Sequence, residues 1–402
     1  MQSAGETMAA KPGLVYLVTG GCGFLGQHVF RMLLEKEDNV AEVRLFDLAV
    51  DDSLANLSTE KVTVKLIQGD ITDLTTVLKV TEGVDVVIHS ASLVDVWHKV
   101  PESKIQAVNV QGTCHVIQAC QDHGIQYLIY TSSMEVVGPN VNGEPFYRAW
   151  PSFFVQRYRR YALVREVPGS RPPSAWVWIA SPCVMPLPLL TEIPTILSQT
   201  QNTHLFSHKV NGGKTLYTCA LRPTGIYGEK HELMRQFYNM GMRTGGWVLR
   251  AIPVNIEHGR VYAGNVAWMH LLAARMIREK PEVVGGQVYF CYDDSPYKSY
   301  EDFNMEFLSR FGFREVRIPY FILTVMAMVN DFLRTLLKPL VNYTPLMNRY
   351  TLTVASTTFT VKTDKAERDF GYRPLYSWQQ CRDNTIAWIS TFAEGVDAQK
   401  EK

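Results

Sequence analysis

The sequence has almost no excess of charge of either sign. Its 40 lysine and arginine residues stand against 39 acidic residues, which gives a formal net charge of +1 over 402 residues. The basic residues are scattered and form no stripe, so nothing favours nucleic acid as a partner. With 46% hydrophobic and 20% charged residues, the chain can bury a large core, enough for one large domain and a smaller lobe. We therefore expect a small-molecule ligand.

Cysteine and histidine spacings typical of metal or redox sites are also missing. The seven cysteines are scattered and include no C-x-x-C pair, which predicts a reducing compartment and no zinc site. His204 and His208 lie four residues apart without a third ligand nearby, so we expect no metal. No apolar signal core precedes Leu14, so we expect no cleaved secretory signal and a catalytic face in the cytosol.

The most informative stretch is 14–26, where an apolar run breaks directly into glycines spaced three residues apart. Glycine in such a turn allows a tight bend and a close approach of the backbone to a pyrophosphate, and the helix that follows offers its free N–H groups. The pattern predicts a cradle for dinucleotide phosphates. The residues expected to contact the cofactor here are Gly20, Gly23, Phe24, Leu25 and Gly26.

The second predicted strand, 43–46, ends at Asp47, about 20 residues beyond the last glycine. A carboxylate at this point binds the ribose diol and repels a 2′-phosphate, which favours NAD over NADP. Arg44 lies close in sequence and weakens that preference. We predict NAD as the cofactor.

Further strands at 62–67, 84–88 and 127–130 alternate with helices, of which 101–123 is capped by Gly124. This alternation specifies a doubly wound parallel sheet, so we predict a Rossmann-type α/β fold with a smaller C-terminal α+β substrate lobe, to which we assign a helix at 265–275 and a strand at 288–292. The strand ends should face the cofactor, although His89 could equally pack in the core. The further predicted contacts are Asp70, Ile71, His89, Ala91 and Thr131.

In order and spacing these motifs resemble the extended short-chain dehydrogenases/reductases. The segments that carry the resemblance are Thr19–Gly26, Asp47, Asp70, His89–Ser92, Asn109–Thr113, Tyr130–Ser133, Leu221–Gly228 and Thr358–Pro374. Tyr130–Asn140, Glu257–Ala274 and Gln287–Met305 are most similar to 3β-hydroxysteroid dehydrogenase/Δ5-Δ4 isomerases, best to the bile-acid (C27 sterol) branch. The resemblance covers 14–147 and 210–390 and adds Pro223 to the expected cofactor contacts.

The resemblance implies NAD-dependent oxidation of a 3β-hydroxy-Δ5 sterol to the 3-oxo-Δ4 product, in steroid or bile-acid biosynthesis. In this family a serine positions the alcohol oxygen, and a tyrosine beside a lysine four residues later accepts the proton. Ser133 matches the serine, with Ser132 as the fallback. A strand-end serine that only satisfies backbone groups is the alternative.

No tyrosine in this sequence is followed by lysine four residues later. The nearest substitute is Tyr161 with Arg165, at about the expected distance after Ser133. Arginine keeps a positive charge near the phenol, but it stays protonated and cannot pass a proton onward. We favour the interpretation in which Tyr161 is an ordinary residue of a basic run.

The stretch 148–209 departs from the family pattern as a whole, since it combines basic, proline-rich and aperiodic segments. Our hypothesis is that unrelated translated sequence, from splicing or a gene-model error, replaces the catalytic helix and leaves the chain inactive. Transcripts with contiguous coding exons across the codons for Arg148 and Lys209 would contradict it. A non-catalytic nucleotide-binding protein, and an enzyme acting on nucleotide sugars or sterol 4-carboxylates, stay open as alternatives.

We divide the chain into an NAD-binding domain (1–147), the atypical insert (148–209), the last sheet strands with the substrate lobe (210–318), a hydrophobic helix (319–341) and a C-terminal lobe segment (342–402). Asp331 and Arg334 interrupt the hydrophobic helix, and each charge costs about 2.5 to 3.5 kcal/mol in a membrane span. We therefore predict an interfacial membrane helix, with a buried lobe helix as the alternative. Because such enzymes reside on the endoplasmic reticulum, we expect that membrane, with the catalytic domain facing the cytosol. The oligomeric state stays open.

Overall fold

The structure, a computed structural model, describes residues 13–95, 99–137, 211–337 and 347–400, with positions 162–163, 179–180, 207–209, 340–341, 343 and 345. Tyr161, Arg165 and most of the atypical insert lie outside the described residues. Within the insert, β6 (Ala162–Leu163) and β7 (Ile179–Ala180) form a short antiparallel pair that is not part of the central sheet.

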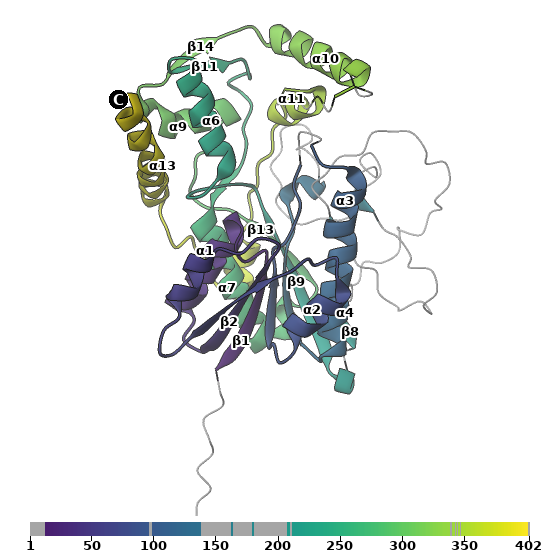
Figure 1. The fold of residues 1–402 in the computed structure, drawn as a ribbon. Helices are drawn as coiled ribbons and strands as arrows, with labels where there is room; N and C mark the ends of the chain where they lie inside the picture. The colour runs from purple at the N-terminus through teal and green to yellow at the C-terminus, as the bar shows by residue number, and fades with distance from the viewer. Residues whose placement is uncertain are drawn as a thin grey trace, which may run out of the picture.

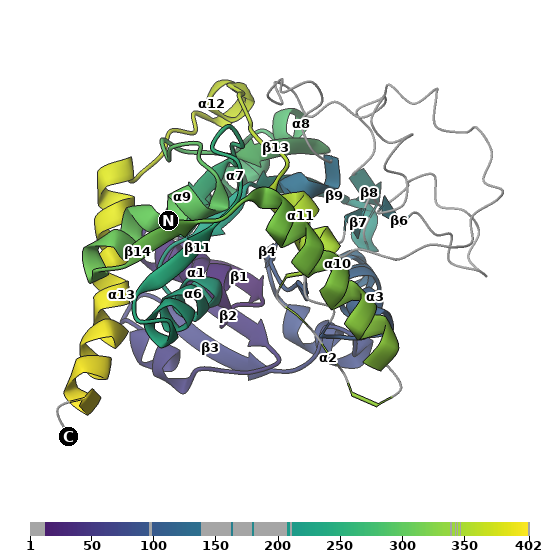
Figure 2. The same ribbon diagram turned by 90° about the horizontal axis from the view of Figure 1, so that it is seen from above.

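A central sheet of seven parallel strands organises the molecule, in the order β13-β9-β5-β4-β1-β2-β3 (Figure 1 and Figure 2). An eighth strand, β8 (Ser207–Lys209), adds an antiparallel edge to β9. The strand order reverses beside β1, which creates the crevice where ligands bind in such sheets. The predicted Rossmann-type fold is confirmed. The bounds are β1 (Leu14–Thr19), β2 (Val40–Asp47), β3 (Thr63–Gln68), β4 (Val86–His89), β5 (Tyr127–Thr131), β9 (Thr215–Pro223) and β13 (Gln287–Cys291).

Helices cover both faces of the sheet, as Figure 1 shows. On one face α1 (Phe24–Lys36) and α7 (Ala263–Glu279) bury apolar side chains such as Phe30 and Met269 against the strands. On the other face lie α2 (Leu74–Thr81) and α4 (Thr113–Asp122). The predicted helix 101–123 forms as α3 (Glu102–Gln106), a π-helical turn η2 (Ala107–Gly112) and α4, and it ends beside Gly124 at a φ of 69°.

One expectation about the second lobe is wrong. The strand expected at 288–292 and the helix expected at 265–275 belong to the central domain, because β13 pairs with β9 and α7 packs on the sheet. Both segments are almost wholly apolar, and such runs do not show which neighbour will cover them.

The substrate lobe lies above the carboxyl edge of the sheet (Figure 1). Its core joins aromatic side chains, among them Tyr227, Phe303 and Phe307, with Ile389. Its elements are β10 (Gly225–Tyr227), α6 (Glu232–Arg243), β11 (Trp247–Arg250), β12 (Arg260–Tyr262), α9 (Tyr300–Leu308), β14 (Arg314–Arg317), α10 (Tyr320–Leu337), α11 (Arg349–Ala355) and α13 (Trp378–Lys400). The remaining elements are α8 (Pro281–Val284), α12 (Lys365–Phe370) and the 3-10 turns η1 (Asp52–Leu57), η3 (Met134–Val137), η5 (Asn211–Gly213) and η6 (Ser309–Phe311).

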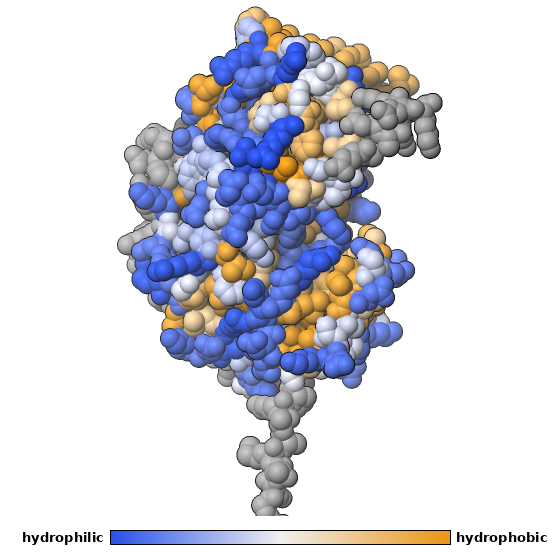
Figure 3. Space-filling model, turned by 90° about the vertical axis from the view of Figure 1, so that its left-hand side faces the viewer, coloured by the Kyte–Doolittle hydropathy of each residue, from blue (hydrophilic) through white to orange (hydrophobic). Residues whose placement is uncertain are grey.

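Helix α10 lies at the top of the lobe and buries little of its surface (Figure 1). Only Leu323 and Ala327 are buried in it, and the hydrophobic surface at the top edge of Figure 3 includes this helix. By length and composition α10 is the one helix in the described part of the chain that could cross a membrane. The alternative of a buried lobe helix is wrong, because its apolar side chains face outward.

Candidate functional site

The glycine turn after β1 is shaped by three close approaches of the backbone. Gly20 has a φ of 68°, and its N–H donates to the Phe46 carbonyl oxygen at 2.8 Å. A Cβ at Gly20 would lie 2.8 Å from the Ala91 nitrogen, and a Cβ at Gly26 would clash with the Gly20 carbonyl oxygen. Helix α1 begins immediately after Gly23, so its free N–H groups point at the space above the turn.

The Asp47 carboxylate lies over this turn from the end of β2. Its Oδ2 accepts the Cys22 N–H at 3.0 Å and lies 4.0 Å from a Cβ built on Gly23. Asp47 is half-buried, and a carboxylate at this strand end is suited to a ribose diol. Asp47 therefore stands beside the glycine turn.

Arg44 points away from this site. Its guanidinium pairs with Glu42 at 2.6 Å and donates to the carbonyl oxygens of Val80 at 2.8 Å and Glu82 at 2.6 Å. Side chains three positions apart on a strand lie on opposite faces, so Arg44 cannot assist a 2′-phosphate at Asp47. Arg44 was the one residue that weakened the predicted preference for NAD, and its position removes that objection.

Residues at or just beyond the ends of β3 and β5 form contacts beneath the crevice. Asp70 accepts the Thr72 N–H at 2.9 Å, and Ile71 is buried against Gly112, where a Cβ would lie 2.6 Å from its side chain. Thr131 hydrogen-bonds His270 Nε2 at 2.8 Å. These residues fix the end of the sheet beneath the crevice.

His89 is a core residue. It is fully buried, with Nδ1 at 2.6 Å from the Thr19 hydroxyl and Nε2 at 2.9 Å from the Thr113 hydroxyl. Burial lowers the pKa of His89 to about 4, so the ring is neutral at physiological pH. Of its two expected roles, packing fits this environment and direct contact with a cofactor does not, because both ring nitrogens are already engaged.

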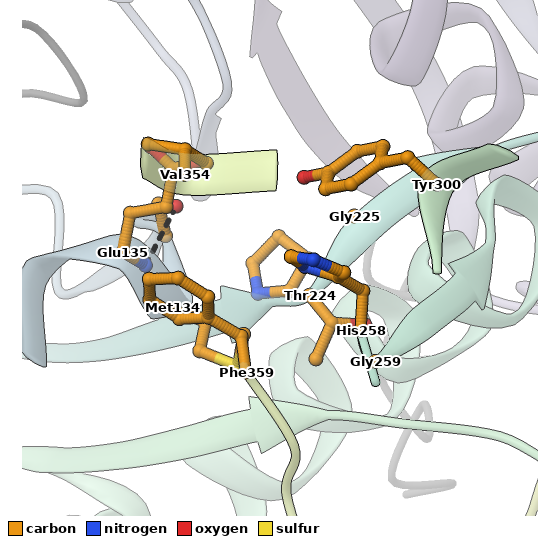
Figure 4. Close-up of a pocket in the computed structure, with 11 residues that line it drawn as sticks. Met134, Glu135, Thr224, Gly225, His258, Gly259, Tyr300, Val354 and Phe359 are labelled. Atoms are coloured by element: carbon orange, nitrogen blue, oxygen red, sulfur yellow. Dashed lines mark hydrogen bonds between the residues drawn. The ribbon is translucent and has the colours of Figure 1, made fainter. Parts of the chain in front are cut away.

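A pocket opens where the carboxyl ends of β5 and β9 meet the substrate lobe (Figure 4). It holds about 350 Å³ of empty space, part of it open to solvent. Ser133 and Pro223 both line it, whereas Ser132 is not among its described lining residues and donates its N–H to the Leu221 carbonyl oxygen at 2.7 Å. The lining residues are Ser133, Met134, Glu135, Pro223, Thr224, Gly225, His258, Gly259, Tyr300, Val354 and Phe359.

In the described part of the chain one hydrogen bond holds the Ser133 side chain. Ser133 Oγ accepts the N–H of Glu135 at 3.2 Å, so its hydroxyl proton remains available to a ligand. The same contact agrees with the alternative expectation, in which Ser133 satisfies backbone groups. Ser133 can therefore fix its own loop and present a donor to the pocket.

Sequence patterns missed four polar residues of the pocket: Glu135, Thr224, His258 and Tyr300. Thr224 is buried, and its hydroxyl has no hydrogen-bond partner in the described part of the chain. His258 is buried with its Nε2 3.1 Å from the Ala355 carbonyl oxygen, and burial lowers the pKa of its ring to about 3. Tyr300 stands at the first residue of α9. No local motif marks these positions, and the last three come close to Ser133 only on folding.

Tyr161 and Arg165 lie outside the described residues, so their predicted role stays a prediction. His204 also lies outside, and His208 is in β8. In the described part of the chain no group of three or more histidine, cysteine or acidic residues could hold a metal ion. The described cysteines are free thiols.

Comparison with known proteins identifies the relatives of this chain. The model of the 3-beta hydroxysteroid dehydrogenase/isomerase family matches residues 17–158 and 203–321 and leaves 159–202 between them unmatched. The chain is 51% identical to mouse 3 beta-hydroxysteroid dehydrogenase type 7 over 385 residues, 95% of this chain and 97% of that protein. It is 50% identical to the human type 7 protein, covering 94% and 95% of the two chains.

More distant relatives include the 3 beta-hydroxysteroid dehydrogenase/Delta 5-->4-isomerase of vaccinia virus (strain Ankara), 39% identical over 93% of this chain and 98% of that one. Among solved structures, a dTDP-glucose 4,6-dehydratase from Streptomyces venezuelae with NAD and TYD bound matches with a TM-score of 0.61 at 16% identity, covering 94% of this chain and 97% of that one. At this identity the match shows the fold alone. The sequence matches show more: this chain belongs to the 3-beta hydroxysteroid dehydrogenase/isomerase family.

Proposed function

We propose that this chain catalyses the NAD-dependent oxidation of a 3β-hydroxy-Δ5 sterol to the 3-oxo-Δ4 product, within steroid or bile-acid biosynthesis. The observation that carries the proposal is that Ser133 lines a pocket at the same edge of the sheet as the Gly20–Gly26 turn. The identity of about half of all residues to type 7 enzymes supports a sterol of the bile-acid branch.

The residues at the glycine turn fit a dinucleotide. A Cβ would block the turn at Gly20 or Gly26, the N-terminal N–H groups of α1 are free to hold a pyrophosphate, and Asp47 stands where a ribose diol would bind. NAD, when bound, supplies the hydride acceptor. Because Arg44 is engaged elsewhere, the carboxylate of Asp47 selects NAD against NADP.

Ser133 would act on the substrate. Its Oγ–H donates to the sterol 3-oxygen and steadies the charge that develops there as the hydroxyl proton leaves. The nearest candidate that the sequence offers for the acceptor of that proton is Tyr161, with Arg165 as the positive charge, although we favour an ordinary role for this tyrosine. Since the sequence holds no Tyr-x-x-x-Lys, a chain that binds NAD and sterol without turnover is the second candidate.

The third function considered, action on nucleotide sugars or sterol 4-carboxylates, has weaker support. The nucleotide-sugar enzymes share the fold at 16% identity, whereas the steroid enzymes share about half of the residues over nearly the whole chain.

A direct assay tests the proposal. Purified protein is mixed with NAD and a 3β-hydroxy-Δ5 sterol, NADH fluorescence is followed, and NAD binding is titrated separately. We expect NADH to form. Binding of NAD without turnover would support the non-catalytic function, and absence of NAD binding would overturn both. If Tyr161→Phe abolishes turnover, Tyr161 is the proton acceptor.

We also propose that the protein associates with the endoplasmic reticulum membrane through α10, with the catalytic domain in the cytosol. Two of the polar residues that interrupt this helix, Asn330 and Asp331, face the protein: the Asn330 amide donates to the Met347 carbonyl oxygen at 2.8 Å, and Asp331 accepts the Arg349 N–H at 3.3 Å. The outward face carries exposed apolar side chains such as Phe321 and Phe332, each 66% exposed. Such a division of faces suits a helix that lies in the membrane surface.

A further inference from the structure

One tyrosine reaches into the pocket from the substrate lobe. Tyr300 is the first residue of α9, which begins at Ser299, whose hydroxyl accepts the Asp302 N–H at 3.1 Å and caps the helix. In Figure 4 its hydroxyl points across the pocket toward Glu135 and Val354. The cap fixes the start of the helix and therefore the direction in which this side chain leaves it.

Two side chains hold the ring in place. The Arg260 guanidinium lies over the Tyr300 ring, 3.9 Å from its centroid, and the His258 ring packs against it at 4.3 Å between centroids. His258 is itself fixed by the Ala355 carbonyl oxygen. The Arg260 side chain packs closely against Gly225. This is possible only because Gly225 has no side chain, since a Cβ there would lie 2.6 Å from Arg260 Nη1. A ring held between such neighbours has little freedom to turn out of the pocket.

The Tyr300 hydroxyl has no hydrogen-bond partner among residues 13–95, 99–137, 211–337 and 347–400. Burial raises the pKa of this phenol; the positive charge of Arg260 opposes the rise and the carboxylate of Glu135 adds to it. The phenol is therefore neutral at physiological pH and can donate. An aromatic hydroxyl that ends in a pocket without a partner is suited to a ligand oxygen.

Arg260 is unusual in its own right. It is 6% exposed, its Nε has no hydrogen-bond partner, and no acidic side chain pairs with it in the described part of the chain. An unpaired buried cation is costly, so a hydrophobic residue of similar volume would serve packing better. Its positive charge beside the phenol polarises the O–H bond and makes Tyr300 a stronger donor.

We propose that Tyr300 donates a hydrogen bond to the sterol 3-oxygen from the lobe side of the pocket, and that Arg260 is the positioning residue behind it. This inference rests on the proposed function, because it names a second donor to the same oxygen that Ser133 would hold. Tyr300 keeps its proton throughout and is no substitute for the missing base. Because Ser133 and Tyr300 belong to different lobes, they can hold the sterol 3-hydroxyl together only in the relative arrangement of the lobes found in this structure.

Binding measurements test the proposal without relying on turnover. In the presence of NAD, dissociation constants are measured for a 3β-hydroxy-Δ5 sterol and for the same sterol lacking the 3-hydroxyl. Tyr300→Phe keeps the ring against Arg260 and removes only the donor. We expect the hydroxysterol to bind about 3- to 10-fold more weakly to Tyr300→Phe, with binding of the deoxy sterol and of NAD unchanged.

Tyr297→Phe is the matched control, because its hydroxyl donates to the Val361 carbonyl oxygen. It should leave the preference for the hydroxysterol unchanged. Arg260→Met should reduce that preference, and Arg260→Lys should restore part of it. If Tyr300→Phe leaves hydroxysterol binding unchanged, or weakens both sterols equally, the inference is wrong. If the unaltered chain binds neither sterol, the proposed function itself fails, and the inference fails with it.

Discussion

The N–H of Cys22 donates to Asp47 Oδ2 at 3.0 Å, so the carboxylate that we propose for the ribose also closes the glycine turn. Cys22 lies in the turn that follows β1, and Asp47 is the last residue of the neighbouring parallel strand β2. A change at Asp47 should therefore act on cofactor choice and on the shape of the turn together.

We expect Asp47→Asn to weaken NAD binding about tenfold and to raise NADP affinity relative to NAD. The amide can still accept the Cys22 N–H, but it no longer repels a 2′-phosphate. The measurement is titration with both dinucleotides. Glu42→Gln, on the same strand and paired with Arg44 and Lys65, is the control. Unchanged selectivity in Asp47→Asn would place the adenosine ribose elsewhere.

Gly26→Ala should abolish NAD binding and lower the free energy of unfolding by about 3 kcal/mol, because the added methyl meets the Gly20 carbonyl oxygen. Gly83→Ala is the comparison. Gly83 has a φ of 71° with no atom within 4 Å of the new methyl, so it should cost only about 1 kcal/mol of strain. Equal losses for the two variants, measured by denaturant unfolding, would argue against a tight turn at Gly26.

Acid should destabilise the protein through His89. Its pKa falls from 6.5 to about 4 in the folded state, so the unfolded chain takes up the proton first as pH drops. The stability from the neutral ring is complete above pH 6.5 and is lost progressively as pH falls toward 4, by about 3 kcal/mol. We expect the pH dependence of thermal unfolding between these values to be shallower in His89→Gln. An identical slope in both proteins would contradict the assignment.

Glu37 ties α1 to α7. Its carboxylate is nearly buried and lies 3.1 Å from the Arg275 guanidinium and 3.5 Å from that of Arg278. Glu37→Gln should lower the free energy of unfolding by about 2 to 3 kcal/mol, because both arginines lose their charged partner. The exposed pair Arg368 and Asp364 provides the control. Asp364→Ala should change the free energy of unfolding by less than about 0.5 kcal/mol. Similar losses for both would mean that Glu37 is effectively solvated.

The outward face of α10 should govern membrane binding. We expect the double variant Phe321→Asp, Phe332→Asp to float several-fold less with phosphatidylcholine and phosphatidylethanolamine vesicles, because both side chains are exposed apolar anchors. Val254→Asp alters an apolar residue of similar exposure outside α10 and should float normally. Undiminished flotation of the double variant would exclude α10 as the contact.

Much of the central domain could be predicted because its signals are local. The turn after β1, the acid at the end of β2 and the capped helix before β5 each depend on residues close in sequence. The assignment of β13 and α7 failed for the opposite reason: an apolar run shows that a segment is buried without showing against what. For His89 the sequence left two roles open, since only burial between Thr19 and Thr113 distinguishes them.

The sequence by itself determined the glycine turn, the carboxylate at the end of the second strand and the absence of Tyr-x-x-x-Lys, because spacing along the chain settles each of them. Only the tertiary structure decided that Arg44 turns away from Asp47, that α10 leaves its apolar face uncovered, and that Tyr300 meets Ser133 in one pocket. These depend on contacts between segments far apart in sequence. The parallel sheet brings its strand ends to one edge, and the substrate lobe closes over that edge from the other end of the chain.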